Sequence, residues 1–359
     1  MFPFGGVSKP VVGLDIGATA IKAVELHRSG RRWSVHRVGW KPLPPKVVSG
    51  GKVKDKEAMV QALRELWSDA RFGCKRVAIA VGGPAVIIKR IQVPLMSELD
   101  LEDQIALEAE EHIPFDIEEV YLDFQILERG AEQMEVLLTA CKKEVVDNRM
   151  EAPREAGLEP VACDMDLFCL ANAFDAFCRP ALAAKGEKSD KIPATTLINV
   201  GASHLSVAIL VNGLPEFTRE HAFGTERLLQ ELQQNQGRSY EDAERMIRLG
   251  RDSRDVPWPG EEREAALNSF LEQMAGLIRQ TVDFHHAGHP NQRVGTVFVA
   301  GGCAAIPELP GTLQSVINLP VVRLDPLSGL AGTTPAPLNS GNAPAFLVAL
   351  GLALRGDAP

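Results

Sequence analysis

The sequence predicts an α/β protein made of two similar halves that face each other across a cleft. The main observation is a block of strand-like sequence near the start of the chain that recurs in its middle. A second observation is that the rest of each half contains segments with the apolar spacing of helices that cover a sheet. At 359 residues the chain also suits two domains better than one small core.

The repeat predicts the order of strands in each half. Val11–Leu26 reads VVGLDIGATAIKAVEL, and Thr195–Leu210 reads TTLINVGASHLSVAIL. Aligned without gaps, Gly17 falls on Gly201, and each block continues into a polar turn and a further strand-like run. These turns and runs are Ser29-Gly30 with Trp33–Val38, and Asn212-Gly213 with Leu214–Arg219. Each copy therefore predicts an antiparallel meander of three strands joined by tight turns.

Three helices are expected from apolar spacing and capping residues. Glu57–Ala70 has one apolar face, and a helix that begins with a capping box at Ser97 runs toward His112. A long helix from about Glu262 to His286 follows the break at Trp258-Pro259-Gly260. Its expected inner face consists of Leu267, Phe270, Leu271, Met274, Ile278 and Val282. The segment Ala181–Lys191, rich in alanine and lysine, is the expected linker between the halves.

Composition and charge exclude several classes of protein. The formal net charge of -9, with no long basic run, argues against nucleic acid as a partner. We expect no signal peptide, because the first ten residues lack an apolar stretch. Ala345–Leu354 is about half the roughly 20 apolar residues that span a bilayer. The six scattered cysteines favour buried free thiols in a reducing cytosol over zinc sites or disulfides. We therefore expect a cytoplasmic protein.

The two glycine turns are a candidate phosphate site. In Asp15-Ile16-Gly17-Ala18-Thr19 the glycine lets backbone N–H groups converge on one anion, and Thr19 adds a hydroxyl donor. Asp15 would hold a magnesium ion directly or through water. One such turn alone is more often an ordinary hairpin turn. Two in register, from opposed halves, favour a clamp for a triphosphate.

A third motif follows an apolar strand near residue 300. Val297–Pro307 runs from the strand into Gly301-Gly302 and a helix start, so that the backbone would approach a flat base or ribose closely. By itself the motif is better explained as a plain strand-to-helix turn. The sequence contains no Walker A loop and no Gly-x-Gly-x-x-Gly after a strand, which argues against P-loop and Rossmann enzymes.

These three segments resemble the two phosphate motifs and the adenosine motif of the superfamily that contains actin, heat-shock chaperones and sugar kinases. Within it the chain is similar, over nearly its whole length, to the PilM family of type IV pilus proteins. The similarity includes Lys89–Pro94 and Ala140–Glu144, and the segments that specify the family are Glu108–Phe115 and the ending Gly351–Arg355.

The resemblance implies an actin-like fold, that is, a duplicated ribonuclease H-like fold, with an inserted subdomain as in the cell-division protein FtsA. The implied division is 1–84, 160–180 and 340–359 for the first half, 85–159 for the insert, and 192–339 for the second half. It further implies a scaffold, cytoplasmic and peripheral to the inner membrane, that binds ATP with Mg. The implied partner is the cytoplasmic N-terminal peptide of the membrane protein PilN, with the pilus motor ATPase and platform protein as further candidates.

The resemblance also assigns residues to the nucleotide. The first phosphate turn would comprise Asp15, Gly17, Ala18, Thr19 and Lys22, and the second Asn199, Gly201, Ala202 and Ser203. Gly301, Gly302 and Cys303 would face the adenosine, and Gly224 would lie near the ribose. Ile113, Pro114 and Phe115 would help to shape the groove for the partner peptide, or would be buried core at a helix exit.

The chain departs from the superfamily pattern at two positions. Asn199 stands where the second phosphate turn normally has aspartate, so one charge that helps to hold magnesium is missing. Thr225 follows Gly224 where a second glycine is usual. For the water-orienting carboxylate of the hydrolases, Asp164 is the first candidate and Asp166 the second; either is also explained as a helix-start aspartate. We therefore expect ATP binding with very slow or absent hydrolysis.

Two alternative functions share the predicted fold. One is a kinase for a small sugar or acid, which Asn199 and the lack of an evident substrate-binding aspartate argue against. The other is a filament-forming protein like FtsA, which would usually end in a basic amphipathic helix. The histidines His285, His286 and His289 suit the negative end of a helix dipole better than a metal site. The acidic run at 108–111 is best read as a solvated helix face.

Overall fold

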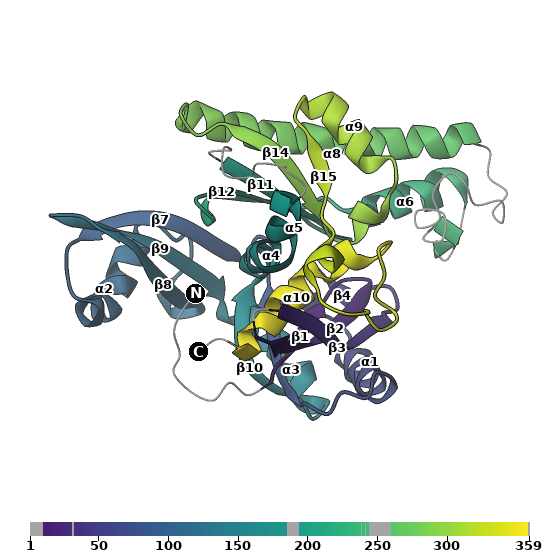
Figure 1. Cartoon of the computed structure of the whole chain (residues 1–359), viewed down its shortest axis with the longest axis horizontal. Helices are drawn as coiled ribbons and strands as arrows, with labels where there is room; N and C mark the ends of the chain where they lie inside the picture. Colours follow the sequence, from purple (N-terminus) through teal and green to yellow (C-terminus); the bar gives the residue numbers. More distant parts are fainter. Residues whose placement is uncertain are drawn as a thin grey trace.

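The computed structural model describes residues 10–357 except 31, 185–193, 238, 241 and 244–259. It contains two five-stranded sheets, one in each half of the chain, and a smaller three-stranded sheet that projects from one side (Figure 1).

The first sheet is built around a meander of three antiparallel strands. Its order is β10-β6-β1-β2-β3, and β6 and β10 continue it in parallel pairing on the other side of β1. The strands are β1 (Val12–Ile16), β2 (Ala20–Ser29), β3 (Arg32–Pro42), β6 (Arg76–Val81) and β10 (Glu159–Met165). A short hairpin of β4 (Val48–Ser49) and β5 (Lys52–Val53) lies beside this sheet.

The second sheet repeats the first, strand for strand. Its order is β13-β12-β11-β14-β15, again with an antiparallel meander on one side and two parallel strands on the other. The strands are β11 (Ala194–Val200), β12 (Leu205–Val211), β13 (Leu214–His221), β14 (Val294–Ala300) and β15 (Val321–Arg323). The turn between β12 and β13 contains Asn212 and Gly213, both at positive φ, as a tight hairpin needs. The duplicated meander predicted from the repeat is confirmed.

Helices cover both sheets and agree with the predicted ones. They are α1 (Lys56–Asp69), α3 (Lys143–Glu155), α4 (Asp166–Ala173), α5 (Arg179–Ala184), α6 (Thr225–Gln236), α8 (Gly260–Gly288), α9 (Leu309–Ile317) and α10 (Leu347–Ala353). The six residues expected on the inner face of the long helix α8 are all buried in the core of the second half. Of the expected break Trp258-Pro259-Gly260, the first two residues lie outside the described residues, and Gly260 is the first residue of α8.

The two halves share a core at the base of the cleft. α4 and α10 pack against each other between the two sheets, and Phe174 lies 5.0 Å from Phe298 of the second half, ring centre to ring centre. α10 approaches β1 so closely that a Cβ atom on Gly13 would lie 2.0 Å from the carbonyl oxygen of Ala349. Glycine at this position therefore allows α10 to pack directly on the first sheet.

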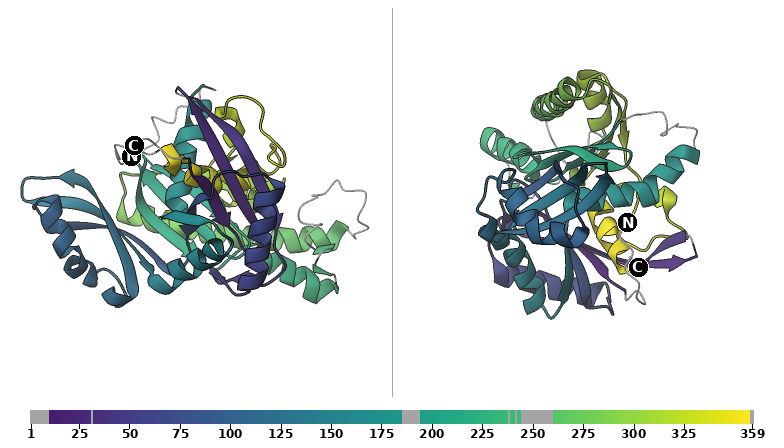
Figure 2. Two further views of the ribbon diagram at one scale, coloured as in Figure 1. Left: turned by 90° about the horizontal axis from the view of Figure 1, so that it is seen from below. Right: turned by 90° about the vertical axis from the view of Figure 1, so that its left-hand side faces the viewer.

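The insert is a separate three-stranded sheet covered on one face by a helix. Its elements are β7 (Val86–Pro94), α2 (Glu98–Glu110), β8 (Val120–Arg129) and β9 (Gln133–Lys142), with the strand order β7-β9-β8. The Ser97 hydroxyl accepts a hydrogen bond from the Asp100 N–H, which confirms the predicted cap of α2. Figure 2 shows the insert standing away from the two halves.

The exact division into domains remains a prediction. The insert's own sheet ends at Lys142. The predicted insert, 85–159, also includes α3, but this helix packs against α1 and contributes Ala152 to the core of the first half. The expected linker Ala181–Lys191 begins inside α5, and its residues from 185 onward lie outside the described residues.

Two expectations from composition can be compared with the fold. All six cysteines are free, and four of them are buried, as expected for unpaired thiols. Within the described part of the chain, no helix combines the length and the apolar character needed to cross a membrane.

Candidate functional site

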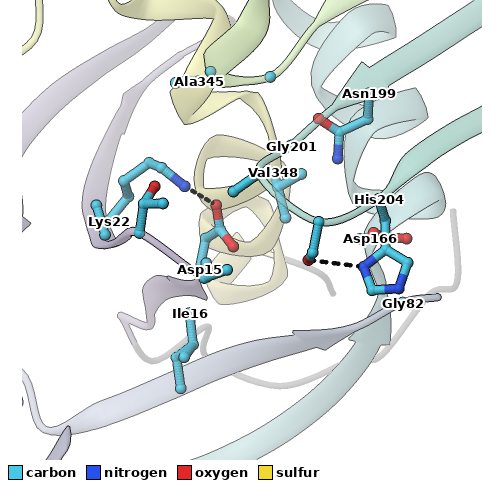
Figure 3. A pocket seen from close by; sticks show the side chains of 18 of the residues that line it. Asp15, Ile16, Lys22, Gly82, Asp166, Asn199, Gly201, His204, Ala345 and Val348 are labelled. Carbon is cyan, nitrogen blue, oxygen red and sulfur yellow. Dashed lines mark hydrogen bonds and ion pairs between the residues drawn. The ribbon is translucent and has the colours of Figure 1, made fainter. Parts of the chain in front are cut away.

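A cleft of about 310 Å³ lies between the two glycine turns, where the two halves face each other. In Figure 3 the side chains of Asp15 and Lys22 lie on the opposite side of this pocket from Asn199. The predicted residues that line it are Asp15, Gly17, Ala18, Thr19, Lys22, Asn199, Gly201, Ala202, Ser203, Gly301, Gly302 and Cys303. The tertiary structure therefore brings together three segments that are far apart in the sequence.

The two turns have the same backbone hydrogen bond. The Gly17 N–H donates to the carbonyl oxygen of Ala20 at 3.1 Å, and the Gly201 N–H donates to the carbonyl oxygen of His204 at 2.9 Å. A Cβ atom on Gly17 would lie 2.9 Å from that Ala20 oxygen, so the first turn needs glycine for its tight geometry.

The turns differ in charge. In the first, Lys22 Nζ pairs with Asp15 Oδ2 at 2.5 Å, because the two residues are direct partners in the β1–β2 register. At the equivalent register position of the second turn, Asn199 is opposite Ser206. Both charges of the first turn are thus replaced by neutral groups in the second.

The Ser206 hydroxyl donates to Oε2 of Glu220 at 2.8 Å, behind the second turn. Burial raises the pKa of Glu220 to about 9, an effect to which the charge of Asp166 also contributes.

The glycines at the third motif have different roles. Gly301 has φ = 89°, and a Cβ atom there would lie 2.4 Å from the carbonyl oxygen of Val200, so the strand-to-helix turn requires glycine. A Cβ atom on Gly302 would meet nothing within 4 Å, which leaves its backbone open to the cleft. The Cys303 side chain is buried in the core of the second half.

Gly224, expected near the ribose, does not line the cleft. It packs behind the second turn, where a Cβ atom would lie 2.2 Å from the carbonyl oxygen of Ala202. Its neighbour Thr225 lines the cleft, and the Thr225 N–H donates to the carbonyl oxygen of Gly201 at 3.2 Å. Gly224 therefore supports the second turn and is placed to shape the site indirectly.

Of the two candidate carboxylates, the second choice lies in the cleft and the first does not. Asp164 pairs with Arg355 and lines a different groove. Asp166, two residues further along, lines the cleft close to Gly82, where a Cβ atom would lie 2.2 Å from Asp166 Oδ2 (Figure 3). In a continuous strand, residues 164 and 166 would point to the same face. Their side chains point to different sites because β10 ends at Met165 and α4 begins at Asp166.

Burial raises the pKa of Asp166 to about 7, and the negative charge of Asp15 adds to this effect. A carboxyl group that titrates near neutral pH in a cleft is suited to exchange protons with water there.

Several lining residues lie outside the motifs that the sequence revealed. They are contributed by the β5 hairpin, the loop after β6, α3, the turn between β11 and β12, and the segment before α10; among them are Gly51, Gly82, Gly83, Arg149, His204 and Phe346. Their proximity to the turns depends on packing between distant segments, for which a single sequence carries no pattern. His204 is an exception, because it directly follows the second turn; its Nδ1 lies 3.0 Å from the Ser203 hydroxyl.

A second groove, of about 360 Å³, lies between the insert and the first half. Its walls are β8 and β9 of the insert on one side, and β10, α3 and α4 on the other. The Tyr121 hydroxyl donates to Asp147 Oδ1 at 3.1 Å, and the side chain of Tyr121 is 47% exposed. Val81 and α3 contribute to both the groove and the cleft, so the two sites share a wall.

The residues Ile113, Pro114 and Phe115 are not part of this groove. On β9 the odd-numbered side chains 137, 139 and 141 line the groove, whereas the even-numbered ones pack with α2 and Ile113 on the opposite face. Ile113 is buried, Pro114 is exposed, and Lys142 Nζ lies 4.4 Å from the ring centre of Phe115. The structure thus places these residues in and around the insert's own core.

The three histidines at the end of α8 make contacts within the second half. His286 Nε2 accepts from the Val294 N–H at 2.9 Å, and His289 lies 3.4 Å from Glu216. Among the described residues, no three histidine, cysteine, aspartate or glutamate side chains are grouped so that they could hold a metal ion.

Two related sheets around a cleft lined by paired glycine turns define an actin-like ATPase fold. The same fold is seen in the ethanolamine utilization protein EutJ from Carboxydothermus hydrogenoformans (17% identity, TM-score 0.58, 98% of this chain and 91% of that chain). It is also seen in MreB5 of Spiroplasma citri bound to AMPPNP (13% identity, TM-score 0.51, 97% and 96%).

The chain belongs to the family of type IV pilus assembly protein PilM, whose model matches residues 13–357. It is similar to a chain in the structure of a PilM–PilN type IV pilus biogenesis complex, with 26% identity and a TM-score of 0.84 over 98% of this chain and 100% of that one.

Proposed function

We propose that this protein is an ATP-binding scaffold of a type IV pilus machine that holds the cytoplasmic N-terminal peptide of PilN. The observation that carries the proposal is the pairing of two sites in one family member: a cleft between the glycine turns and a groove between insert and first half. The similarity to a chain from a PilM–PilN complex supports the choice of partner. Links to the pilus motor and platform, and through PilN to the inner membrane, are part of the same proposal.

The residues of the cleft fit a nucleoside triphosphate. The first turn and Lys22 would hold the phosphates, and the open backbone at Gly302 leaves room for the adenosine. Asp15 would hold magnesium through water, although its pairing with Lys22 and the neutral Asn199 leave little negative charge for the metal. The fit is therefore better for the nucleotide than for a tightly held Mg²⁺ ion.

Slow hydrolysis follows from the same groups. Asp166 replaces Asp164 in this proposal as the carboxylate that would orient water, because it lines the cleft. With one metal-holding carboxylate missing at Asn199, we expect turnover far below ordinary enzyme rates. A steady-state ATPase rate on the order of 10 per second would contradict this expectation.

The groove suits an extended peptide for two reasons. β8 is an edge strand of the insert's sheet, so its outer edge can pair with a further strand, which would have to displace the bond from the Phe124 N–H to Asp123 Oδ1 at 2.9 Å. The lining combines apolar side chains such as Leu137 and Phe168 with the exposed ring of Tyr121, which is the mixture that anchors a peptide and sets its register.

The test is a calorimetric titration of the full chain with a synthetic peptide that copies the PilN N-terminus, with and without Mg-ATP. Saturable binding at micromolar strength or better supports the scaffold. Tyr121→Ala removes a half-exposed ring from the groove, and we expect about tenfold weaker binding without loss of folding.

Pro114→Ala is the matched control, because Pro114 is exposed but outside the groove. We expect it to bind the peptide normally; weakened binding would restore the Ile113–Phe115 segment as the peptide site. If no peptide binds in either nucleotide state, the proposed partner is wrong. If the protein then sedimented as a polymer in the presence of ATP, the filament-forming alternative would be favoured. If it phosphorylated sugars or acids, the kinase alternative would be favoured.

A further inference from the structure

Arg149 extends from α3 into the wall of the cleft beside the first glycine turn. Its Nε donates to the carbonyl oxygen of Gly51 at 2.8 Å, and its Nη1 donates to that of Ile16 at 2.5 Å. These two bonds fix the guanidinium on the backbone of the β5 hairpin and on the residue that precedes Gly17. α3 is contributed by a segment more than a hundred residues beyond the turn, so the placement is produced by the fold alone.

The hydrogen-bonding capacity of Arg149 is not filled by the protein. A guanidinium has five N–H donors, and within the described residues its third nitrogen, Nη2, donates to no protein acceptor. No ion pair of Arg149 occurs among the described residues, whereas the other strongly basic side chain of the cleft, Lys22, is paired with Asp15. Arg149 is therefore a positioned cation with donors left over for a ligand.

Burial lowers the pKa of Arg149, and the negative charges of Asp15 and Asp166 act against this effect. Burying the charged guanidinium costs desolvation free energy, which an anionic ligand in the cleft would offset. The planar fork of a guanidinium matches the oxygens of a phosphate group in a bidentate arrangement.

The position of Arg149 indicates which part of a nucleotide it would meet. It is held by the first turn of the first half, whereas the expected adenosine turn, Gly301–Cys303, comes from β14 of the second half. Arg149 therefore belongs to the phosphate end of the cleft. At this end the neutral Asn199 weakens the metal site, so that a protein cation has more of the triphosphate charge to neutralise.

We propose that Arg149 binds the terminal phosphate of a nucleoside triphosphate and so makes the cleft distinguish ATP from ADP. This inference rests on the proposed nucleotide binding and adds to it the residue that senses the third phosphate. A charge-assisted hydrogen bond of this kind is expected to change affinity by about ten- to a hundredfold.

The experiment is calorimetric titration of the full-length protein with ATP and with ADP, for the wild type, Arg149→Met and Arg149→Lys. We expect Arg149→Met to weaken ATP binding by about ten- to a hundredfold while ADP binding changes by less than about threefold. Arg149→Lys keeps the charge but loses the bidentate fork, and should lie between the two.

Arg64→Met is the matched control, because Arg64 is an exposed arginine of α1 that lines neither the cleft nor the groove. It should bind both nucleotides as the wild type does. Near-ultraviolet circular dichroism and the unfolding midpoint show whether each variant is folded, so that a lost nucleotide contact is distinguished from a folding defect. If Arg149→Met does not fold, Arg149→Lys still tests the inference.

The outcomes distinguish this inference from the function on which it rests. Wild-type protein that binds neither nucleotide refutes the proposed nucleotide binding, and this inference with it. Wild-type protein that binds both, together with equal losses for ATP and ADP in the variants, would mean that Arg149 only braces the turn through Ile16 and Gly51. Unchanged ATP affinity in a folded Arg149→Met protein would also refute the inference.

Discussion

Replacing Arg355 by methionine removes the cation that pairs with Asp164 in the wall of the groove. Arg355 Nε donates to Asp164 Oδ2 at 2.8 Å. The aspartate side chain is 4% exposed and that of Arg355 37%, so the variant leaves an almost fully buried carboxylate without its partner. Because the two residues are 191 positions apart, the pair also ties the end of the chain to β10.

The expected loss of unfolding free energy is about 2 to 3 kcal/mol. Removing one partner of a fully buried pair typically costs about 3 to 5 kcal/mol. Two features of this pair reduce that figure. Arg355 is partly exposed and therefore partly screened. The Met165 N–H also still donates to Asp164 Oδ1, at 2.8 Å, in the variant. Methionine keeps most of the length and apolar contact of the arginine stem.

Urea unfolding followed by circular dichroism would measure the loss, and a double-mutant cycle would assign it to the pair. Asp164→Asn alone should also destabilise, whereas Arg355→Met combined with Asp164→Asn should lose clearly less than the sum of the two. Arg154→Met, an exposed arginine of the same groove, should change stability by less than about 0.5 kcal/mol. A coupling energy near zero would show that the pair does not hold the terminus to β10.

Two further predictions concern the cleft and the insert. Burial raises the pKa of Asp166 to about 7 and that of Glu220 to about 9 in the folded protein. The folded state therefore holds these protons more tightly than the unfolded state does. The stability that the two groups contribute should fall as pH rises from about 4.5 toward these values. Glu220→Gln should make the pH dependence of urea unfolding between pH 5 and 9 shallower, and an unchanged slope would contradict the burial of this carboxyl. Arg90 of the insert binds the second half, because its Nη1 lies 2.7 Å from Glu216 Oε2 and its Nε donates to the Pro215 carbonyl oxygen at 2.9 Å. Arg90→Ala should lower the free energy of unfolding by about 1 to 2 kcal/mol. The double variant Arg90→Glu with Glu216→Arg should be more stable than Arg90→Glu alone.

Local sequence determined the repeated architecture. The spacing of the two glycine turns within their strand blocks was enough to predict two equivalent meanders, since a tight hairpin and alternating apolar residues leave few other conformations. The capped start of α2 at Ser97 and the inner face of α8 were predictable for the same reason: capping and helical periodicity act over a few residues.

Local sequence also identified most of the cleft, because the two turns and Gly301-Gly302 each form a compact motif. The superfamily pattern made Asp164 the first candidate and Asp166 the second, since two carboxylates at the end of a strand cannot be told apart until the structure orients their side chains. The family resemblance suggested Ile113–Phe115 as part of the partner groove, while the apolar character of this segment was equally consistent with the core of the insert.

Only the tertiary structure showed which residues face each other across the strands and between distant segments. The two equivalent register positions, Asp15 with Lys22 and Asn199 with Ser206, showed that one turn is a charge pair and the other is neutral. Arg149 reaches the first turn across a separation of 133 residues, and the groove forms only where the insert packs beside β10 and α3. Such contacts arise from the packing of distant segments, whose energies depend on shape and burial in three dimensions and leave no periodic pattern in one sequence.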